Sequence, residues 1–160
     1  MDHIGVTVPD IEQATDFFAG MLGCKVLYDV GPFIADDDWM QDYLLVHPRS
    51  VIRKLRMLDT GNGTMIELFE YQAPDQKTHI PANSDFGASH IGLYVEDMDA
   101  AVRYLRDHSV KVLKGPVTMT EGPSAGLTWI YFLAPWGMQL ELVSYPNGLA
   151  CDKTVEGASL

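Results

Sequence analysis

The sequence has few cysteines, few basic residues and no long apolar run. Among its 160 residues, Cys24 and Cys151 are too few for a disulfide framework and have no CxxC spacing. Eleven Lys and Arg residues stand against 22 Asp and Glu residues, and the formal net charge of -11 argues against nucleic acid as a partner. No apolar stretch approaches the roughly 18 residues of a membrane span, and the first residues lack the regions of a signal peptide. We therefore expect a cytoplasmic protein with no membrane partner.

An internal repeat fills most of the chain. At an offset of 87, HIGVTVPD at residues 3–10 aligns with HIGLYVED at residues 90–97. At an offset of 74, a second set of positions matches: Gly63, Glu67, Leu68 and Tyr71 align with Gly137, Glu141, Leu142 and Tyr145. With 47% hydrophobic residues, the chain is long enough for one globular domain with its own core, built from two copies of one unit.

Each copy begins with a strand pattern and continues with a helix pattern. Apolar residues alternate at the start of each copy, and Asp10 and Asp97 are good N-caps for the helices that follow. Further strands are expected at 24–30, 42–46, 53–59 and 65–71, and at 110–114, 127–132 and 139–144. Each copy is therefore roughly βαβββ, although the third strand of the second copy is hard to place.

These patterns predict the organisation of the chain. We expect a single domain over 1–146, divided into a first repeat at 1–71, a linker at 72–88 and a second repeat at 89–146. A polar tail follows at 147–160. The first copy also has an insertion at 31–41, which is a candidate lid.

The residues that carry chemistry recur in both copies. His3 and His90 lie on the strand face opposite the alternating apolar residues, and Glu67 and Glu141 stand in mid-strand between apolar neighbours. A pseudo-twofold pairing of the copies would bring all four together. Two imidazoles and two carboxylates suit one divalent metal ion, and the set does not choose among Zn, Ni, Co, Mn and Fe.

The alternative is that these are ordinary strand residues. A lone histidine or glutamate on a strand is usually solvated, but recurrence of all four at matched positions favours the metal site.

Substrate contacts are predicted from a basic cluster and from aromatic residues. Arg53 belongs to a run of basic residues at 49–56 that would receive an anionic group, although charge protecting an edge strand explains the run equally well. Aromatic candidates for a cavity wall are Trp39, Tyr43, Phe69, Tyr94, Trp129 and Tyr131.

Three segments resemble the vicinal oxygen chelate superfamily, the glyoxalase, bleomycin-resistance and dioxygenase group. They are DHIGVTVPDIEQATDFF near the start, SHIGLYVEDMDAAV in mid-chain and YFLAPWGMQLEL near residue 140. The resemblance implies an α+β fold in which two βαβββ repeats form an incomplete barrel around a cavity. It also implies that His3, Glu67, His90 and Glu141 are the metal ligands, and that the protein is a homodimer.

Departures from the family patterns narrow the expected chemistry. Thr7 and Tyr71 stand where glyoxalase I has residues that grip glutathione, and Gly122-Pro123-Ser124 stands where ring-cleaving dioxygenases have a histidine. A carboxylate at Glu67 favours a metal-dependent lyase, isomerase or epimerase that acts on a small anionic substrate through a metal-stabilised enediolate. In that scheme Glu141 is the base and Glu67 returns the proton.

Two other functions remain open from the sequence. One is an extradiol-type ring-cleaving dioxygenase, and the other is a metal-free small-molecule binding protein of the drug-resistance type.

Overall fold

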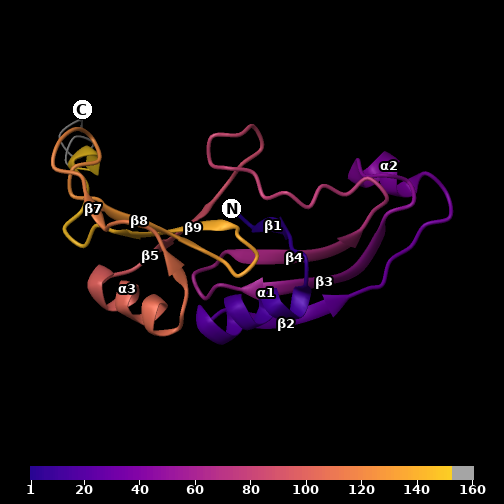
Figure 1. The fold of residues 1–160 in the computed structure, drawn as a ribbon, viewed down its shortest axis with the longest axis horizontal. Helices are drawn as coiled ribbons and strands as arrows, with labels where there is room; N and C mark the ends of the chain where they lie inside the picture. Colours follow the sequence, from indigo (N-terminus) through magenta and orange to yellow (C-terminus); the bar gives the residue numbers. More distant parts are fainter. Residues whose placement is uncertain (153–160) are drawn as a thin grey trace, which may run out of the picture. The chain divides into compact units, whose positions relative to one another are not determined.

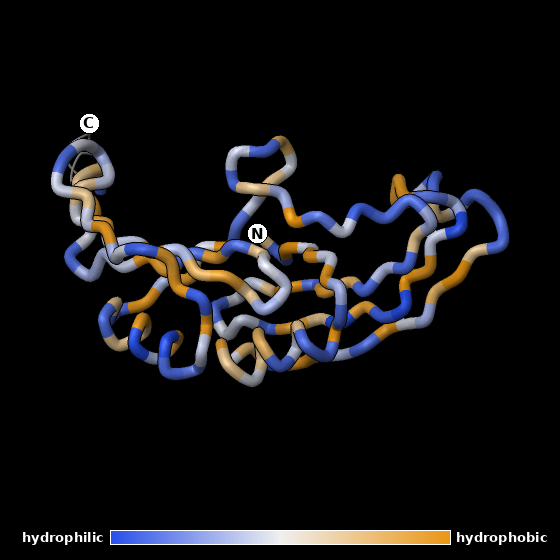
Figure 2. Tube along the Cα trace, viewed as in Figure 1, coloured by the Kyte–Doolittle hydropathy of each residue, from blue (hydrophilic) through white to orange (hydrophobic). Residues whose placement is uncertain are grey.

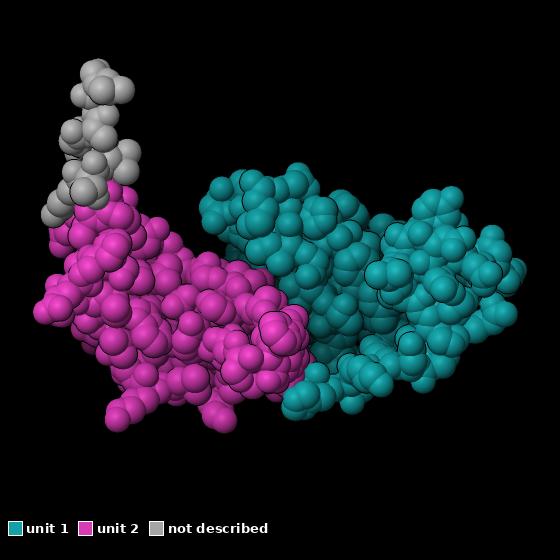
Figure 3. All heavy atoms as spheres, turned by 90° about the horizontal axis from the view of Figure 1, so that it is seen from above, with its two compact units in different colours: residues 1–79 teal, residues 80–160 magenta. Residues whose placement is uncertain are grey.

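The structure is a computed structural model that describes residues 1–152 and contains two compact units. The first unit runs from Met1 to His79 and the second begins at Ile80, so the division falls inside the predicted linker 72–88. Figure 3 colours the first unit teal and the second magenta. Each unit holds one copy of the repeat and one β-sheet.

The sheet of the first unit has four strands in the order β1-β4-β3-β2. β1 runs parallel to β4, whereas β4, β3 and β2 are antiparallel neighbours (Figure 1). The elements of this unit are β1 (His3–Thr7), α1 (Ile11–Thr15), the π-helical η1 (Asp16–Met21), β2 (Lys25–Val30), α2 (Trp39–Leu44), β3 (Val51–Asp59) and β4 (Met65–Gln72).

The second unit repeats this connectivity. Its sheet has the order β5-β9-β8-β6, with β7 also paired to β8, and β5 runs parallel to β9. The elements are β5 (Ile91–Tyr94), α3 (Met98–Asp107), β6 (Lys111–Val112), β7 (Val117–Thr118), β8 (Thr128–Leu133) and β9 (Gln139–Ser144). The two βαβββ repeats and the α+β class are thus confirmed, and each sheet is open.

Local signals place the helices as predicted. The Asp10 carboxylate accepts hydrogen bonds from the backbone N–H groups of Glu12 and Gln13, and Asp97 does the same for Ala100. These bonds satisfy donors that have no partner within the helix.

Each sheet buries one face beneath its helix. The buried residues alternate along β4, β8 and β9, whereas β3 buries three consecutive residues, 56–58. Figure 2 shows hydrophobic and hydrophilic residues alternating along the tube. The fully or nearly fully buried side chains include Val8, Ile11, Phe18, Leu58, Ile66 and Leu68 in the first unit and Val102, Leu105, Ile130, Phe132, Leu140 and Leu142 in the second. Because strand side chains alternate, the opposite face of each sheet carries the other set of side chains, in which Glu67 and Glu141 stand among aromatic and aliphatic residues.

The matched positions Arg56 and Ile130 differ between the helix-covered faces of the two copies. In the first unit Arg56, paired with Leu68 across β3 and β4, donates hydrogen bonds to Glu12, Asp29 and Thr15 at 2.6–2.8 Å. In the second unit Ile130, paired with Leu142, holds the same position and is fully buried. At this position, the first copy joins helix to sheet through charge, and the second buries an apolar side chain.

One predicted strand is wrong. Residues 42–46 were expected to be extended, but Trp39–Leu44 is the helix α2, which ends where Leu45 adopts a left-handed φ of 54°. Trp39 stacks on Tyr43 four residues later, with ring centroids 5.1 Å apart, and contacts Phe33 at 4.9 Å. The i, i+4 aromatic pair stabilises a helical turn.

The remaining segments surround these elements. The difficult strand of the second copy is the two-residue β7. In the predicted tail, the backbone N–H groups of Ala150 and Cys151 donate to Ala125 and Pro123, and residues 153–160 lie outside the described part of the chain. No helix within residues 1–152 has the length and apolar character needed to cross a bilayer.

Candidate functional site

The first unit brings His3 and Glu67 together on the sheet face that its helix α1 does not cover. β1 and β4 are parallel neighbours, and Gly5, two residues after His3, lies beside Glu67 in the register. His3 Nε2 lies 3.4 Å from Glu67 Oε2, and the Glu67 side chain is 19% exposed. This separation is longer than an ordinary N–H···O hydrogen bond of about 2.7–3.2 Å. The two atoms face each other without the geometry of a hydrogen bond.

Asp2 holds the His3 ring from its other side. His3 Nδ1 and Asp2 Oδ2 are 2.8 Å apart. This hydrogen bond raises the pKa of His3, and the charge of Glu67 adds to the rise. In the neutral ring the bond favours a proton on Nδ1, which leaves the Nε2 lone pair directed at Glu67.

The second unit contains an equivalent pair. His90 Nε2 lies 3.3 Å from Glu141 Oε2, and the Glu141 side chain is 17% exposed. β5 and β9 are parallel, and Gly92 lies beside Glu141 as Gly5 lies beside Glu67. Tyr131 contacts the His90 ring edge-on, with centroids 5.2 Å apart.

The two glycines leave space next to the carboxylates. A Cβ built on Gly92 would lie 3.7 Å from Glu141 Oε2, and one on Gly5 would lie 3.8 Å from Phe69. Any longer side chain would extend from there across the face that holds the His–Glu pair. The sequence contained this signal, because both glycines occur in the repeated His-Ile-Gly segment, but sequence reasoning did not use it.

Each unit thus provides one pair. Within the described chain no group of three or more His, Cys, Asp or Glu side chains is close enough to hold a metal ion. The set of four ligands around one ion stays a prediction.

The predicted aromatic residues mostly share the faces of these pairs. Phe69 follows Glu67 by two residues and stacks on Tyr71 with centroids 5.4 Å apart. Trp129 and Tyr131 lie next to each other on β8 at 5.2 Å, on the face that carries His90. Tyr94 is also on that face, against Tyr145 at 5.0 Å. Trp39, at the start of α2, contacts Tyr43 of the same helix and Phe33, which precedes the helix.

Arg53 lies away from the His–Glu pair. Its Nε is 3.3 Å from Glu70 Oε1, and Glu70 also accepts from the backbone N–H of Ile11 at the start of α1, so this ion pair is on the helix-covered side. Lys54 and Arg56 also pair with carboxylates, those of Glu12 and Asp29. Most of the basic cluster is therefore matched by acidic side chains, and a substrate role for Arg53 stays a prediction.

Tyr71 lies at the far end of the same strand face as Glu67. Burial raises the pKa of the Tyr71 phenol, and the charge of Glu67 raises it further. The phenol is therefore a stable hydrogen-bond donor at neutral pH.

The sequence matches the Glyoxalase/Bleomycin resistance protein/Dioxygenase superfamily over residues 1–142. The chain belongs to this superfamily. The resemblance inferred from the repeated segments is thereby confirmed.

A curated relative and several solved structures are similar to this chain over most of its length. A 2-epi-5-epi-valiolone epimerase from Actinomyces sp. is 44% identical over 155 residues, which cover 96% of this chain and 84% of the relative. Solved structures share the fold at lower identity. A glyoxalase family protein from Bacillus cereus has a TM-score of 0.69 at 19% identity, covering 90% of this chain and 92% of its own. A trypanothione-dependent glyoxalase I from Leishmania major has a TM-score of 0.60 at 22% identity, covering 98% and 92%.

Proposed function

We propose that this chain is a metal-dependent epimerase that inverts a carbon next to a carbonyl group, with 2-epi-5-epi-valiolone or a close analogue as its substrate. The observation that carries the proposal is the presence of two equivalent His–Glu pairs in a chain 44% identical to an epimerase of that name. Superfamily membership supports a metal-assisted reaction on a small molecule.

The geometry of each pair fits a shared divalent ion. Two ligands that each bind an ion at about 2.0–2.2 Å stand about 3 Å apart when they occupy neighbouring coordination positions. The pairs have separations of 3.4 and 3.3 Å. The space beside Gly92 and the Asp2 hydrogen bond to His3 also fit, because ligating imidazoles are commonly held by a carboxylate on their other nitrogen. His3, Glu67, His90 and Glu141 would together hold the ion.

Epimerisation requires a proton to leave one face of a carbon and return to the other, with no net oxidation or reduction. We assign Glu141 as the base that takes this proton, while the electron pair of the broken C–H bond moves toward the carbonyl oxygen. Glu67, from the other copy, gives a proton to the opposite face of the planar carbon, and solvent restores both protonation states. A bound divalent ion supplies Lewis acidity that lowers the barrier to such proton removal.

The aromatic residues beside each pair suit this chemistry. Phe69, Trp129 and Tyr131 present rings on the faces that carry Glu67 and Glu141. Apolar walls exclude water and strengthen the electrostatic interactions of the reacting groups.

We also propose a cytoplasmic homodimer. β2 is the edge strand of the first sheet, and four of its side chains are exposed apolar groups: Val26, Leu27, Tyr28 and Val30. A second copy covering this edge would bury them. Light scattering at micromolar concentration should give twice the mass of the 17.8 kDa chain, and a monomer would contradict the assignment.

The test of the enzymatic proposal is proton exchange under anaerobic conditions. Protein reconstituted with Zn, Ni, Co, Mn or Fe(II) should convert 2-epi-5-epi-valiolone to its epimer in D₂O and incorporate one deuterium, as followed by NMR. Glu141→Gln should lower kcat by at least 100-fold and leave KM within about threefold, because the lost proton transfer acts in the transition state.

The matched control is Glu121→Gln, which changes an exposed glutamate in the connection between β7 and β8 and should leave kcat unchanged. Full activity after removal of the ion by a chelator, or in Glu141→Gln, would contradict the mechanism. Stoichiometric oxygen consumption would favour the ring-cleaving dioxygenase, and tight binding of the ketone with no exchange would favour the binding protein.

A further inference from the structure

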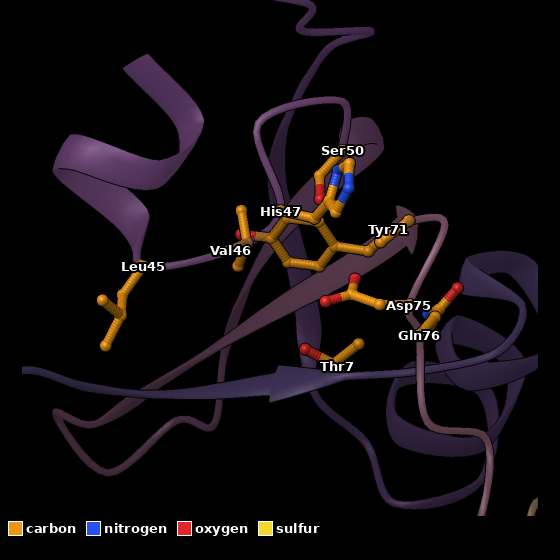
Figure 4. A pocket seen from close by; sticks show the side chains of 9 residues that line it. Thr7, Leu45, Val46, His47, Ser50, Tyr71, Asp75 and Gln76 are labelled. Atoms are coloured by element: carbon orange, nitrogen blue, oxygen red, sulfur yellow. The ribbon is translucent and has the colours of Figure 1, made fainter. Parts of the chain in front are cut away.

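A cavity of about 310 Å³ opens within the first unit at the end of β1 and β4 (Figure 4). It lies between the segment 45–50, which connects α2 to β3, and the segment 73–76, which follows β4. Three apolar side chains line part of it. The others are polar: Thr7, His47, Ser50, Tyr71, Asp75 and Gln76.

Ser50 is the strongest sign that this cavity receives a ligand. The residue is 1% exposed, and its hydroxyl is buried without a hydrogen-bond partner in the described chain. Buried hydroxyls are nearly always paired, so an unpaired one beside a cavity fits a group that arrives from outside. The Ser50 backbone N–H donates to the carbonyl of His47 at 2.8 Å, and Figure 4 shows these two side chains at the same end of the cavity.

His47 has a fixed hydrogen-bonding role at this end. Its Nδ1 accepts a hydrogen bond from the backbone N–H of Arg49 at 3.0 Å. The neutral ring therefore carries its proton on Nε2, which makes this nitrogen a donor. The cavity thus combines a histidine donor with hydroxyl groups, which both donate and accept.

The charge of the cavity lining disfavours anions. Asp75 contributes a carboxylate, and Figure 4 shows it directed into the same space as the Tyr71 ring. No lysine or arginine is among the described residues that line the cavity. A phosphate or carboxylate bound there would meet a like charge with no cation among the lining side chains, whereas the hydroxyl groups of a neutral molecule would donate to Asp75.

The cavity continues the strand face that carries the His–Glu pair of this unit. Thr7 follows His3 by four residues on β1, and Tyr71 follows Glu67 by four residues on β4, so both point to the same side as the pair. Four strand residues cover about 13 Å between Cα atoms. A hydroxylated six-membered ring is shorter than this, so the side chains that line the cavity must reach toward the pair to contact the same substrate.

We propose that this cavity binds the hydroxyl groups of a neutral polyhydroxylated ring and that Asp75 rejects phosphorylated or carboxylated analogues. The proposal rests on the proposed function, because it describes the far end of the same substrate. It differs from the anionic substrate expected from the basic cluster, whose Arg53 lies on the other face of the sheet, paired with Glu70.

The first experiment measures binding without turnover. Glu141→Gln protein is titrated with myo-inositol as a neutral cyclitol and with myo-inositol 1-phosphate as its anionic counterpart, and the backbone amide signals of Ser50, Asp75 and Gln76 are followed by NMR. We expect myo-inositol to shift these signals and to bind at least tenfold more tightly than the phosphate. Equal binding, tighter binding of the phosphate, or no shift at these residues overturns the proposal.

Variants then test the assigned side chains. Asp75→Ala should weaken myo-inositol binding about tenfold, the size of one hydrogen bond to a charged group. Ser50→Ala should weaken it about threefold without lowering the melting temperature, because the removed hydroxyl has no partner in the free protein. Asp16→Ala, an exposed aspartate outside the cavity, is the matched control and should bind as the parent does. Unchanged binding in Asp75→Ala overturns the proposal.

A second readout separates this inference from the proposed reaction. In active protein, Asp75→Ala should raise KM for 2-epi-5-epi-valiolone about tenfold and leave kcat within twofold. If the parent epimerises this ketone and the variant has the same KM, the cavity assignment is wrong and the reaction stands. If the parent shows no epimerisation, the myo-inositol titration still decides the cavity assignment.

Discussion

Replacing Arg56 with methionine is expected to destabilise the protein by about 2 kcal/mol at neutral pH and by much less in acid. Arg56 joins α1 to β2 and β3 through the carboxylates of Glu12 and Asp29. Methionine replaces the unbranched aliphatic stem of arginine without its guanidinium, so the change removes the ionic contacts and keeps most of the apolar packing of the stem. The effect therefore reports on the charges themselves.

The magnitude follows from the exposure of the three groups. The Arg56 side chain is 10% exposed, whereas those of Glu12 and Asp29 are 62% and 41% exposed and return to water when the guanidinium is removed. The cost therefore stays below that of breaking a buried pair. Surface ion pairs contribute about 0.2–1 kcal/mol each to stability. The Arg56 guanidinium is nearly buried and donates hydrogen bonds of 2.6–2.8 Å, so we assign both of its pairs the upper end of this range. Two such pairs give about 2 kcal/mol.

The sign of the pH dependence is set by the carboxyl groups. Hydrogen bonds from Arg56 and Lys54 lower the pKa of Glu12 to about 2, and the hydrogen bond from Arg56 lowers that of Asp29. A group with a lower pKa in the folded state stabilises fully above its unfolded pKa, and this stabilisation is lost as the pH falls through the folded value. The difference between parent and Arg56→Met should thus be constant above pH 5 and shrink between about pH 4.5 and 2.

Urea unfolding followed by circular dichroism at pH 7, 5, 4 and 3 measures this difference. Lys54→Met is the control, because Lys54 is more exposed and pairs only with Glu12 among these carboxylates, and it should cost about 0.5 kcal/mol. A loss below 0.5 kcal/mol for Arg56→Met at pH 7, or one that is the same at pH 7 and pH 3, would refute the reasoning.

Three further predictions concern single side chains. Asp2→Ala should weaken divalent-ion binding 10- to 100-fold by calorimetry, whereas Ser89→Ala, the matched position in the second copy, should have no effect; equal effects would contradict the carboxylate's role. Gly92→Val should keep the fold by circular dichroism but abolish ion binding, because its added methyl groups extend from a Cβ 3.7 Å from Glu141 Oε2; retained binding would show that this space is not needed. Ser109→Gly should raise the free energy of unfolding by about 1 kcal/mol, because Ser109 has a left-handed φ of 60°; a decrease in urea unfolding would be inconsistent with backbone strain there.

The fold could be predicted where local and repeated signals agree. The strand at 3–7 and the helix that begins after Asp10 follow from alternation and capping, which depend only on neighbouring residues. The same signals recur 87 residues later, so the first strand and the helix of the second copy could be predicted in the same way. The strand predicted at 42–46 was wrong because a short apolar run fits the helical period of about 3.6 residues as well as the strand period of two. The stacking of Trp39 on Tyr43, four residues apart, favours the helix.

The site could be predicted within each copy for a similar reason. Strand parity fixes the face of a side chain, so His3 and Glu67 had to share a face once β1 and β4 became neighbours. The partner of Arg53 could not be predicted, since it depends on the bulge in β3 between Ile52 and Lys54 and on the position of Glu70. The cavity is formed by the connections 45–50 and 73–76, whose conformations follow no period in the sequence.

The exchange of Arg56 for Ile130 at one matched position makes the two copies respond differently to their solvent. Added salt screens the ionic contacts beneath α1, whereas sulfate and similar ions strengthen the apolar contacts beneath α3. Cooling weakens the apolar contacts and has no comparable effect on hydrogen-bonded charges. At this matched position, the contact beneath α1 is therefore weakened by salt and acid, whereas the contact beneath α3 is weakened by cooling.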